Sequence, residues 1–498
     1  MKKLRLELAV LFLVSLAFRI LFFIFVAVPA GDAAQFASFV REISEAGGNI
    51  PAVNTIYFPG SPYIYPPLLF LVAYWISIPF SSFVAVGGIF YMDTLLSIAA
   101  IFSSMTACVI YALLPETNRR DERMIRFIVL AFLSPDLFVL TFGGFPSIVS
   151  VFFLVVMIFS LSRRNEGLKW KLIPPLAIIM VGLSHDLTYF LAIYLMLVFT
   201  FYDYFMRRSL FRQDLVTLLG GFVVGVAWWL PRIGFLLSAI FTSQSQGVGI
   251  FSQSSDILPS AIGIMPSFLA LLVISLSQYF HSRVFRDNYR LSYFEVSALA
   301  SILGIPFIIL NPAVSARFVI YFILFALVAA LASLGILWKP RDKRDRGKVV
   351  TVVLALLLVL IPAQIVATEN SLGFYSSGTF QYDQQLITWG KGNITNGTVV
   401  APSSIGEYLC AIDGLKVITY TGYFVGSNEV AQRNAAAEIV INSTSNQSLG
   451  YISRYSVSYV IVQKDLLGQK IDGHTIKFPS PLYSLVKTTQ YYEVFIVR

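Results

Sequence analysis

The chain has 498 residues, of which 57% are hydrophobic and only 13% are charged. That is too little polar material to coat a soluble globule of this size, so we expect most of the chain to face lipid or other helices. The net charge of +9 would suit nucleic acid, but the basic residues gather in short loops between apolar segments, which argues against that partner. Cys108 lies in an apolar run and Cys410 in a polar one, so no disulfide is predicted.

Most of the 36 Lys and Arg residues fall in six clusters, at 2–5, 119–126, 163–171, 207–212, 283–290 and 339–348. Short loops rich in Lys and Arg stay in the cytoplasm, so these clusters mark the inner face of a membrane. An even number of spans must then separate any two of them. The pattern predicts an α-helical polytopic membrane protein with about eleven spans, its amino terminus inside and its carboxyl terminus outside.

In chain order, the predicted spans cover 6–28, 83–114, 127–141, 146–162, 172–185, 187–205, 214–237, 259–280, 292–310, 316–338 and 348–367. The first span is long for a cleaved signal, so we interpret it as a retained anchor. The apolar stretch 66–80 would be only about 22 Å long as a helix, against a hydrocarbon core of ~30 Å. We therefore expect it to be an interfacial helix within a long outer loop, 29–82.

The composition becomes polar near the end of the last span, which predicts a transmembrane domain at 1–367 and an extracytoplasmic domain at 368–498. Short β-branched runs at 398–401, 417–420, 457–462 and 492–497 alternate with helical stretches such as 429–441, the pattern of a small α/β domain. All four N-x-Ser/Thr glycosylation sequons lie in this tail, at Asn393, Asn396, Asn442 and Asn446. Their confinement agrees with an outward-facing tail.

Ionisable residues near the outer ends of the predicted spans are candidates for a site, namely Asp32, Asp93, His185, Asp186, Arg232 and Arg317. A charge inside a span costs roughly 2.5 to 3.5 kcal/mol at mid-depth, so such residues are usually paired or functional. Structural alternatives exist for each: an N-cap for Asp32, lipid snorkelling for the two arginines, a locally bonded turn for His185-Asp186, and an ion pair for Asp93. Arg19 and Asp136 lie deeper and predict intramembrane polar contacts.

Asp32, soon after the first span, and Tyr65-Pro66-Pro67-Leu68, later in the same loop, resemble the GT-C superfamily of polytopic membrane glycosyltransferases. That superfamily includes protein O-mannosyltransferases, aminoarabinose transferases and oligosaccharyltransferases, and the resemblance covers the whole layout. It implies inverting transfer of a sugar from a polyprenyl-phosphate donor to a protein or glycan acceptor at the outer face, with Asp32 as general base. Substrate and phosphate binding would fall to Arg317, Arg232, His185, Asp186 and Tyr65, with Asp93 and Arg19 as polar support.

The chain also departs from the family pattern. Ala33 follows Asp32 where many members have a second acid, and Phe145-Pro146 stand where relatives often place another. Trp228-Trp229 is followed by Leu230-Pro231, so the Trp-Trp-Asp-Tyr-Gly signature of oligosaccharyltransferases is absent and whole-glycan transfer to asparagine is the weaker option. A catalytically inactive relative that binds lipid-linked glycan or a surface partner is therefore an alternative.

A secondary transporter and a bound divalent metal are both disfavoured. A secondary transporter would carry an internal repeat with matching broken spans, and the sequence has no convincing one. The proposed chemistry requires no metal, and the sparse outer carboxylates would make a poor cage for a divalent cation. We expect membrane lipid to contact the predicted spans.

Overall fold

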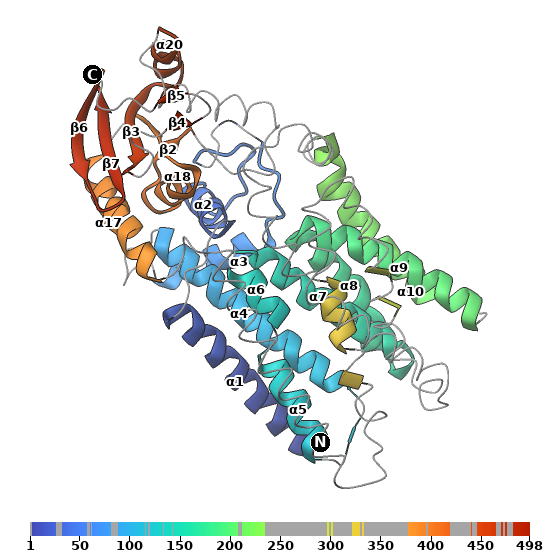
Figure 1. The fold of residues 1–498 in the computed structure, drawn as a ribbon. Helices are drawn as coiled ribbons and strands as arrows, with labels where there is room; N and C mark the ends of the chain where they lie inside the picture. Colours follow the sequence, from blue (N-terminus) through green and yellow to red (C-terminus); the bar gives the residue numbers. More distant parts are fainter. Residues whose placement is uncertain are drawn as a thin grey trace. The chain divides into compact units, whose positions relative to one another are not determined.

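The computed structural model describes residues 2–25, 32–56, 60, 62–80, 88–114, 116–117, 120–132, 134–141, 143–207, 212–234, 296–297, 300–301, 321–328, 331–332, 377–394, 397–418, 440, 446–464, 470–471, 474–475 and 482–498. These residues are mostly helical, with a small mixed sheet near the carboxyl terminus (Figure 1). They form two compact units. The first contains α1, most of α4 and the helices from α5 to α10, and the second contains α2, α3, the start of α4, Arg232 and the elements from α17 onward.

The first unit is entirely helical in the part of the chain that is described. Its helices are α1 (Lys2–Phe25), α4 (Gly88–Leu113), α5 (Arg120–Ala131), α6 (Ser134–Thr141), α7 (Phe145–Ser162), η2 (Arg164–Glu166), α8 (Leu168–Ser184), α9 (Asp186–Arg207) and α10 (Arg212–Val224). A π-helical turn, η3 (Gly225–Trp229), and a 3-10 turn, η4 (Leu230–Arg232), extend α10. The predicted spans 6–28, 83–114, 146–162, 172–185 and 187–205 correspond to α1, α4, α7, α8 and α9.

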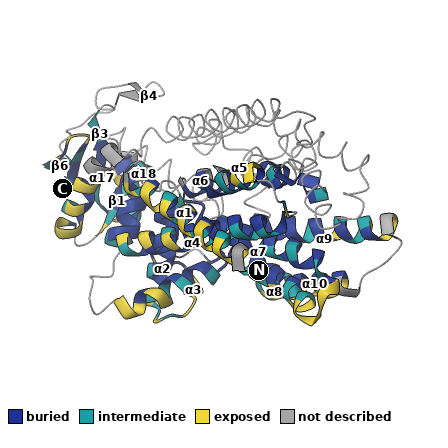
Figure 2. Cartoon of the chain, turned by 90° about the horizontal axis from the view of Figure 1, so that it is seen from below, coloured by how far each residue is buried: buried dark blue, intermediate teal, exposed yellow. Residues whose placement is uncertain are grey.

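Five helices within the described residues are long and apolar enough to cross a membrane: Leu4–Ile24, Ile89–Leu113, Phe145–Ser162, Asp186–Phe205 and Asp214–Arg232. Large apolar side chains remain exposed along α1 and α10, among them Leu13, Leu21 and Phe222 (Figure 2). Such a surface is unfavourable in water and suits lipid, which makes this a membrane protein. The count of about eleven spans stays a prediction, because the last four spans lie largely outside the described residues.

The stretch 127–141, predicted as a single span, is divided between two helices. α5 ends at Ala131 and α6 begins at Ser134, so two short helices occupy this stretch. Pro135 has no N–H to donate to the Ala131 carbonyl, as a continuous helix would require. That carbonyl instead accepts a hydrogen bond from Nη1 of Arg19 at 3.1 Å. A side chain from α1 thus satisfies the backbone group that the proline leaves open.

Two helices of the second unit lie within the predicted outer loop, 29–82. They are α2 (Asp32–Glu45) and α3 (Leu68–Ser77), the latter continued by the 3-10 turn η1 (Ile78–Phe80). A helix forms within the predicted stretch 66–80, but it starts only after Pro66 and Pro67. At ten residues, α3 is about 15 Å long and too short to span a bilayer. Its position at the membrane interface remains a prediction.

The carboxyl-terminal part folds around a five-stranded sheet with the order β2-β1-β3-β7-β6. Its strands are β1 (Thr398–Val400), β2 (Lys416–Val417), β3 (Val457–Gln463), β6 (Tyr483–Thr488) and β7 (Tyr492–Val497). β2, β1 and β3 are parallel, whereas β7 runs antiparallel to β3 and β6. A separate two-stranded pair is formed by β4 (Lys470–Ile471) and β5 (His474–Thr475).

The helices of this part are α17 (Ser377–Asn393), α18 (Ser403–Tyr408), the π-helical η6 (Leu409–Asp413) and α20 (Asn446–Tyr455). Val400, Val460 and Phe495 form the centre of a buried core, and Tyr451 and Tyr455 of α20 pack against it. All four strands predicted from the β-branched runs occur, so the mixed α/β character is confirmed. The predicted helix 429–441 and the predicted boundary at 367–368 lie outside the described residues, apart from residue 440.

Candidate functional site

Asp32 is the first residue of α2, and its side chain is half-buried. A carboxylate in the first turn of a helix interacts favourably with the positive end of the helix dipole. The next eight residues, 33–40, are all buried, and α2 packs against both α3 and η6. The candidate general base therefore begins an element that is enclosed by its surroundings, which fixes the backbone from which the carboxylate projects.

The polar face of α2 is also buried, and Glu42 on it organises the outer loop. Its Oε1 accepts backbone N–H bonds from Thr55 at 3.2 Å and from Ile56 at 2.8 Å. The Sγ of Cys410, in η6, donates to the Ile56 carbonyl at 3.4 Å. Hydrogen bonds to a charged acceptor contribute about 1.5 to 3 kcal/mol each. The segment that leads into the Tyr-Pro-Pro-Leu motif is thus tied to α2 and to η6.

Tyr65 belongs to a cluster of aromatic side chains between α2 and α3. It is only 4% exposed, and its ring centroid lies 5.0 Å from that of Phe36, 5.6 Å from Phe70 and 6.0 Å from Phe39. Edge-on and tilted aromatic pairs at these separations add about 0.5 to 1.5 kcal/mol to the burial of the rings. The structure gives Tyr65, predicted as a substrate-binding residue, a packing role within the loop.

Arg232 reaches the same loop from the end of the α10 extension. Its Nε donates a hydrogen bond to the backbone carbonyl of Tyr63 at 3.3 Å. The Tyr63 side chain is buried, and burial, assisted by the nearby Glu42, raises the pKa of its hydroxyl well above the ordinary value. Of the residues predicted for the site, the structure therefore brings Arg232 and Tyr65 to one segment, which packs beside the helix that Asp32 begins.

His185 and Asp186 form a locally bonded turn in the first unit. His185 ends α8, and its ring Nδ1 lies 2.9 Å from Oγ1 of Thr188, while Nε2 lies 3.4 Å from Oδ1 of Asp186. Asp186 Oδ1 also accepts the N–H of Leu187 at 2.6 Å. The Thr188 hydroxyl continues the chain to the hydroxyl of Tyr321 at 2.5 Å. The imidazole is 3% exposed and is held by this network.

Arg19 and Asp136 are joined through Ser103 in the interior of the first unit. Arg19 Nε donates to Ser103 Oγ at 2.7 Å, and Ser103 Oγ donates to Asp136 Oδ2 at 2.8 Å. Arg19 also bonds the hydroxyl and carbonyl of Ser15. Asp93, in contrast, has an exposed side chain on α4. Ser103 thus links the deep cation and the deep carboxylate, while Nη2 of Arg19 is buried without a hydrogen-bond partner among the described residues.

The remaining predicted residues contribute less to the geometry. Arg317, Asn396 and Asn442 lie outside the described residues. Asn393 is exposed at the end of α17, where its Nδ2 donates to the Trp389 carbonyl at 2.8 Å, and Asn446 begins α20. Within the described part of the chain, no group of three or more His, Cys, Asp or Glu side chains could hold a metal ion.

Sequence reasoning did not identify several residues that shape these contacts. Glu42, Tyr63 and Tyr321 carry no motif, and Thr188 meets Tyr321 across 133 positions of sequence. Glu42 gave one signal in the sequence, because it is a further acidic residue in the stretch that follows Asp32. The other contacts depend on tertiary packing and could not be found from spacing.

Solved structures share this fold, although no protein-family model and no curated protein matches the sequence. The oligosaccharyltransferase of Archaeoglobus fulgidus, in a complex with zinc and sulfate, aligns over 92% of this chain and 68% of its own, with a TM-score of 0.59 and 16% identity. The same enzyme with an inhibitory peptide and a dolichol-phosphate aligns over 92% and 69%, with a TM-score of 0.57 and 16% identity.

A second enzyme extends the comparison. The mycobacterial arabinofuranosyltransferase AftD aligns over all of this chain and 40% of its own length, with a TM-score of 0.54 and 13% identity. Both enzymes are membrane glycosyltransferases of the GT-C superfamily. The chain thus shares its fold with these enzymes over most of its length, at a sequence identity of 13 to 16%. The resemblance predicted from Asp32 and the Tyr-Pro-Pro-Leu motif is confirmed at the level of the fold.

Proposed function

We propose that this protein is a membrane glycosyltransferase that moves a sugar from a polyprenyl-phosphate donor to an acceptor at the outer face of the membrane. The observation that carries the proposal is the GT-C fold together with Asp32 at the start of an enclosed helix, α2. A structural neighbour binds dolichol-phosphate, and another structure of it carries a tethered acceptor peptide. These ligands support a lipid-linked donor and a protein or glycan acceptor.

In this mechanism Asp32 accepts the proton of an acceptor hydroxyl as that oxygen attacks the anomeric carbon. The bond between the anomeric carbon and the phosphate oxygen breaks, and the polyprenyl phosphate leaves with the bonding electrons. Attack from the face opposite the leaving group inverts the anomeric centre. Arg232 and Arg317 would stabilise the negative charge that grows on the phosphate. The contact of Arg232 with the Tyr63 carbonyl supports its assignment to this loop.

An inactive glycan-binding relative is the second candidate, and one observation favours it. Ala33 occupies the position where many family members carry a second acid, and its side chain is 0% exposed. The site thus relies on one carboxylate from this pair. A protein with this fold and without turnover would bind the lipid-linked glycan or a surface partner without transferring the sugar.

The decisive experiment measures release of polyprenyl phosphate from polyprenyl-phosphate mannose and polyprenyl-phosphate glucose by the purified full chain in lipid, with peptides rich in Ser and Thr as the hydroxyl acceptors. We expect Asp32→Asn to lower turnover by roughly 10²- to 10⁴-fold, the usual contribution of a general base. Glu45→Gln, at the exposed far end of the same helix, is the matched control and should retain wild-type turnover. Unchanged turnover in Asp32→Asn would remove this residue from the mechanism, and donor binding without any release by the wild type would favour the inactive relative.

A further inference from the structure

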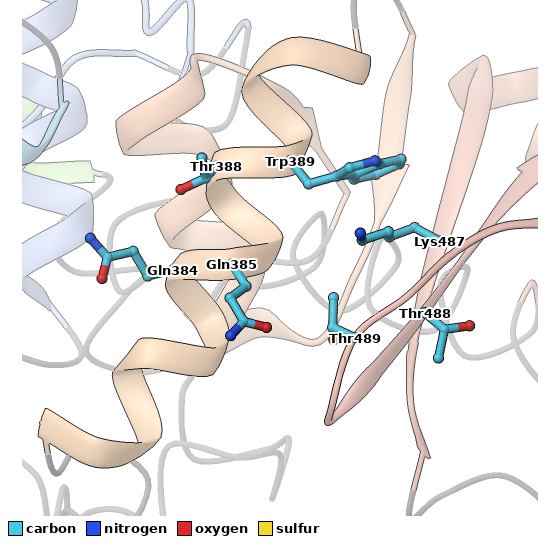
Figure 3. Close-up of a pocket in the computed structure, with 7 residues that line it drawn as sticks. All are labelled: Gln384, Gln385, Thr388, Trp389, Lys487, Thr488 and Thr489. Atoms are coloured by element: carbon cyan, nitrogen blue, oxygen red, sulfur yellow. The ribbon is translucent and has the colours of Figure 1, made fainter.

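A polar hollow of about 570 Å³ lies on the carboxyl-terminal domain between α17 and β6 (Figure 3). Its size falls within the roughly 300 to 1,000 Å³ of small-molecule pockets. The residues that line it are Gln384, Gln385, Thr388, Trp389, Lys487, Thr488 and Thr489. Figure 3 shows Trp389 and Lys487 reaching toward the space between the helix and the strand, with Gln385 and Thr489 lower in the same view.

Both walls of this hollow are fixed by the fold. α17 is anchored by Leu386 and Ile387, which are buried, while Trp389 keeps a partly exposed ring. The buried face of the helix and the lining face recur at helical spacing, so this anchoring fixes the backbone from which the indole projects. The Trp389 carbonyl also accepts the Asn393 side chain at 2.8 Å, which closes the last turn of α17.

The strand wall carries a local irregularity at the hollow. The pairing of β6 with β7 shifts register between Leu485 and Lys487, and the adjoining turn is closed by Thr489 Oγ1, which accepts the N–H of Tyr492 at 3.0 Å. A bulge re-aims the side chains next to it and disrupts the ladder of a sheet edge. This bulge sets the direction of Lys487. It also disfavours addition of a peptide strand to β6, which is an edge strand of the sheet.

The described side chains that line the hollow provide one flat aromatic ring, neutral hydrogen-bonding groups and one cation. None of these described side chains is a carboxylate. Amide and hydroxyl side chains both donate and accept hydrogen bonds, as a set of sugar hydroxyls requires. A sugar ring presents a face of C–H groups that suits the electron-rich face of an indole. An anionic substituent on the sugar would complement the ammonium group of Lys487.

We propose that this hollow is a binding site for an acidic saccharide, with Trp389 as the stacking platform and Lys487 as the partner of the sugar carboxylate or ester anion. Gln385 and Thr489 hydrogen-bond the ring hydroxyls. The site is separate from the proposed transfer reaction, because binding here requires neither a lipid-linked donor nor Asp32. Failure of the transfer proposal would leave this one standing, and the reverse also holds.

The test uses the full chain in lipid nanodiscs and isothermal titration with three probes: a disaccharide that ends in glucuronic acid, its neutral glucose counterpart, and a short acidic peptide. We expect the acidic disaccharide to bind more tightly than the neutral one and the peptide not to bind. Trp389→Ala should weaken binding about tenfold, in line with the loss of an aromatic contact, while Trp389→Phe should retain most of it. Lys487→Met should abolish the preference for the acidic sugar while leaving the neutral one unaffected.

Lys416→Met is the matched control, because Lys416 is exposed on β2 at the opposite edge of the sheet, and it should bind like the wild type. Thermal unfolding of each variant establishes that the domain remains folded. Equal affinity of Trp389→Ala and the wild type would overturn the proposal. So would binding of the acidic peptide alone, or no binding of either disaccharide.

Discussion

At the residue scale, several buried polar side chains of the first unit hydrogen-bond one another. Arg19 connects α1 to Ser103 of α4 and to the Ala131 carbonyl left open by Pro135. His185 is similarly enclosed with Thr188. A buried donor or acceptor without a partner costs about 1 to 3 kcal/mol, which explains why these side chains are grouped. Asp413 differs from these residues, because its ionisation makes the stability of the protein depend on pH.

Asp413 ends η6 and packs beside α17, where its Oδ2 lies 3.2 Å from the position that a Cβ on Gly390 would take. Burial raises the pKa of this carboxyl to about 7, although Lys391 and Arg41 act in the opposite direction. The folded state therefore holds the proton more tightly than the unfolded chain. Between pH ~4 and ~7 only the unfolded carboxyl ionises, so this group lowers stability as the pH rises through that window.

We predict that Asp413→Asn has a higher midpoint of thermal unfolding than the wild type at about pH 7.5, with the difference shrinking toward about pH 4. The asparagine keeps the shape of the side chain and cannot ionise, so the free-energy cost of ionising a buried carboxyl in the folded state disappears. Thermal unfolding of the full chain across this pH range measures the effect. Parallel curves for the two proteins would contradict the pKa assigned to Asp413.

At the scale of elements, a buried ion cluster joins three parts of the first unit. Arg164 in η2 donates to Asp203 of α9 at 2.8 Å and to Asp214, near the start of α10, at 2.6 Å. All three side chains are almost fully buried. Arg164 therefore does more than add charge to a basic loop: it fixes how α9 and α10 meet the end of α7.

Arg164→Met should destabilise the protein by about 3 to 5 kcal/mol, because it leaves two buried carboxylates without their shared cation. The adjacent Arg163 is the matched control. Its side chain is about a quarter exposed and lies over the Trp170 ring at 5.1 Å, so Arg163→Met should cost at most about 1 kcal/mol. The free energy of unfolding of both variants is measured with denaturant in the same lipid or detergent. Equal losses of this free energy would mean that the buried cluster stabilises the protein no more than the partly exposed Arg163 does.

The sequence predicted features that depend on local patterns and missed features that depend on contacts between distant residues. Hydrophobic period and β-branched runs are local, so α1, α4 and α9, along with β3 and β7, were predicted correctly. The break between α5 and α6 was missed although Pro135 is a visible signal, because the apolar run continues across it. For the site, Asp32 and Arg232 could be nominated by depth and resemblance. The enclosure of Tyr65 and the link from Thr188 to Tyr321 arise from long-range packing, which spacing does not encode.

At the scale of the whole molecule, the outer-loop helices and the carboxyl-terminal sheet belong to one compact unit. Arg41 of α2 illustrates the connection, since its Nη1 donates to the Ile412 carbonyl at 3.0 Å and its guanidinium lies against Gly414. Gly414 has φ = +70°, and a side chain there would meet the guanidinium at 2.5 Å. The helix that Asp32 begins is therefore supported by η6 within this unit.

The orientation of the chain in the membrane tests the proposal that transfer takes place at the outer face. If the six basic clusters lie in the cytoplasm, Lys169, exposed at the start of α8, is inside, and Lys416, exposed on β2, is outside. A membrane-impermeant maleimide applied to intact cells should label Lys416→Cys and should label Lys169→Cys only after lysis. The native Cys410 is buried and Cys108 is partly buried, so the wild type supplies the background. Labelling of Lys169→Cys in intact cells would reverse the orientation and move Asp32 to the inner face, where the proposed transfer at the outer face could not occur.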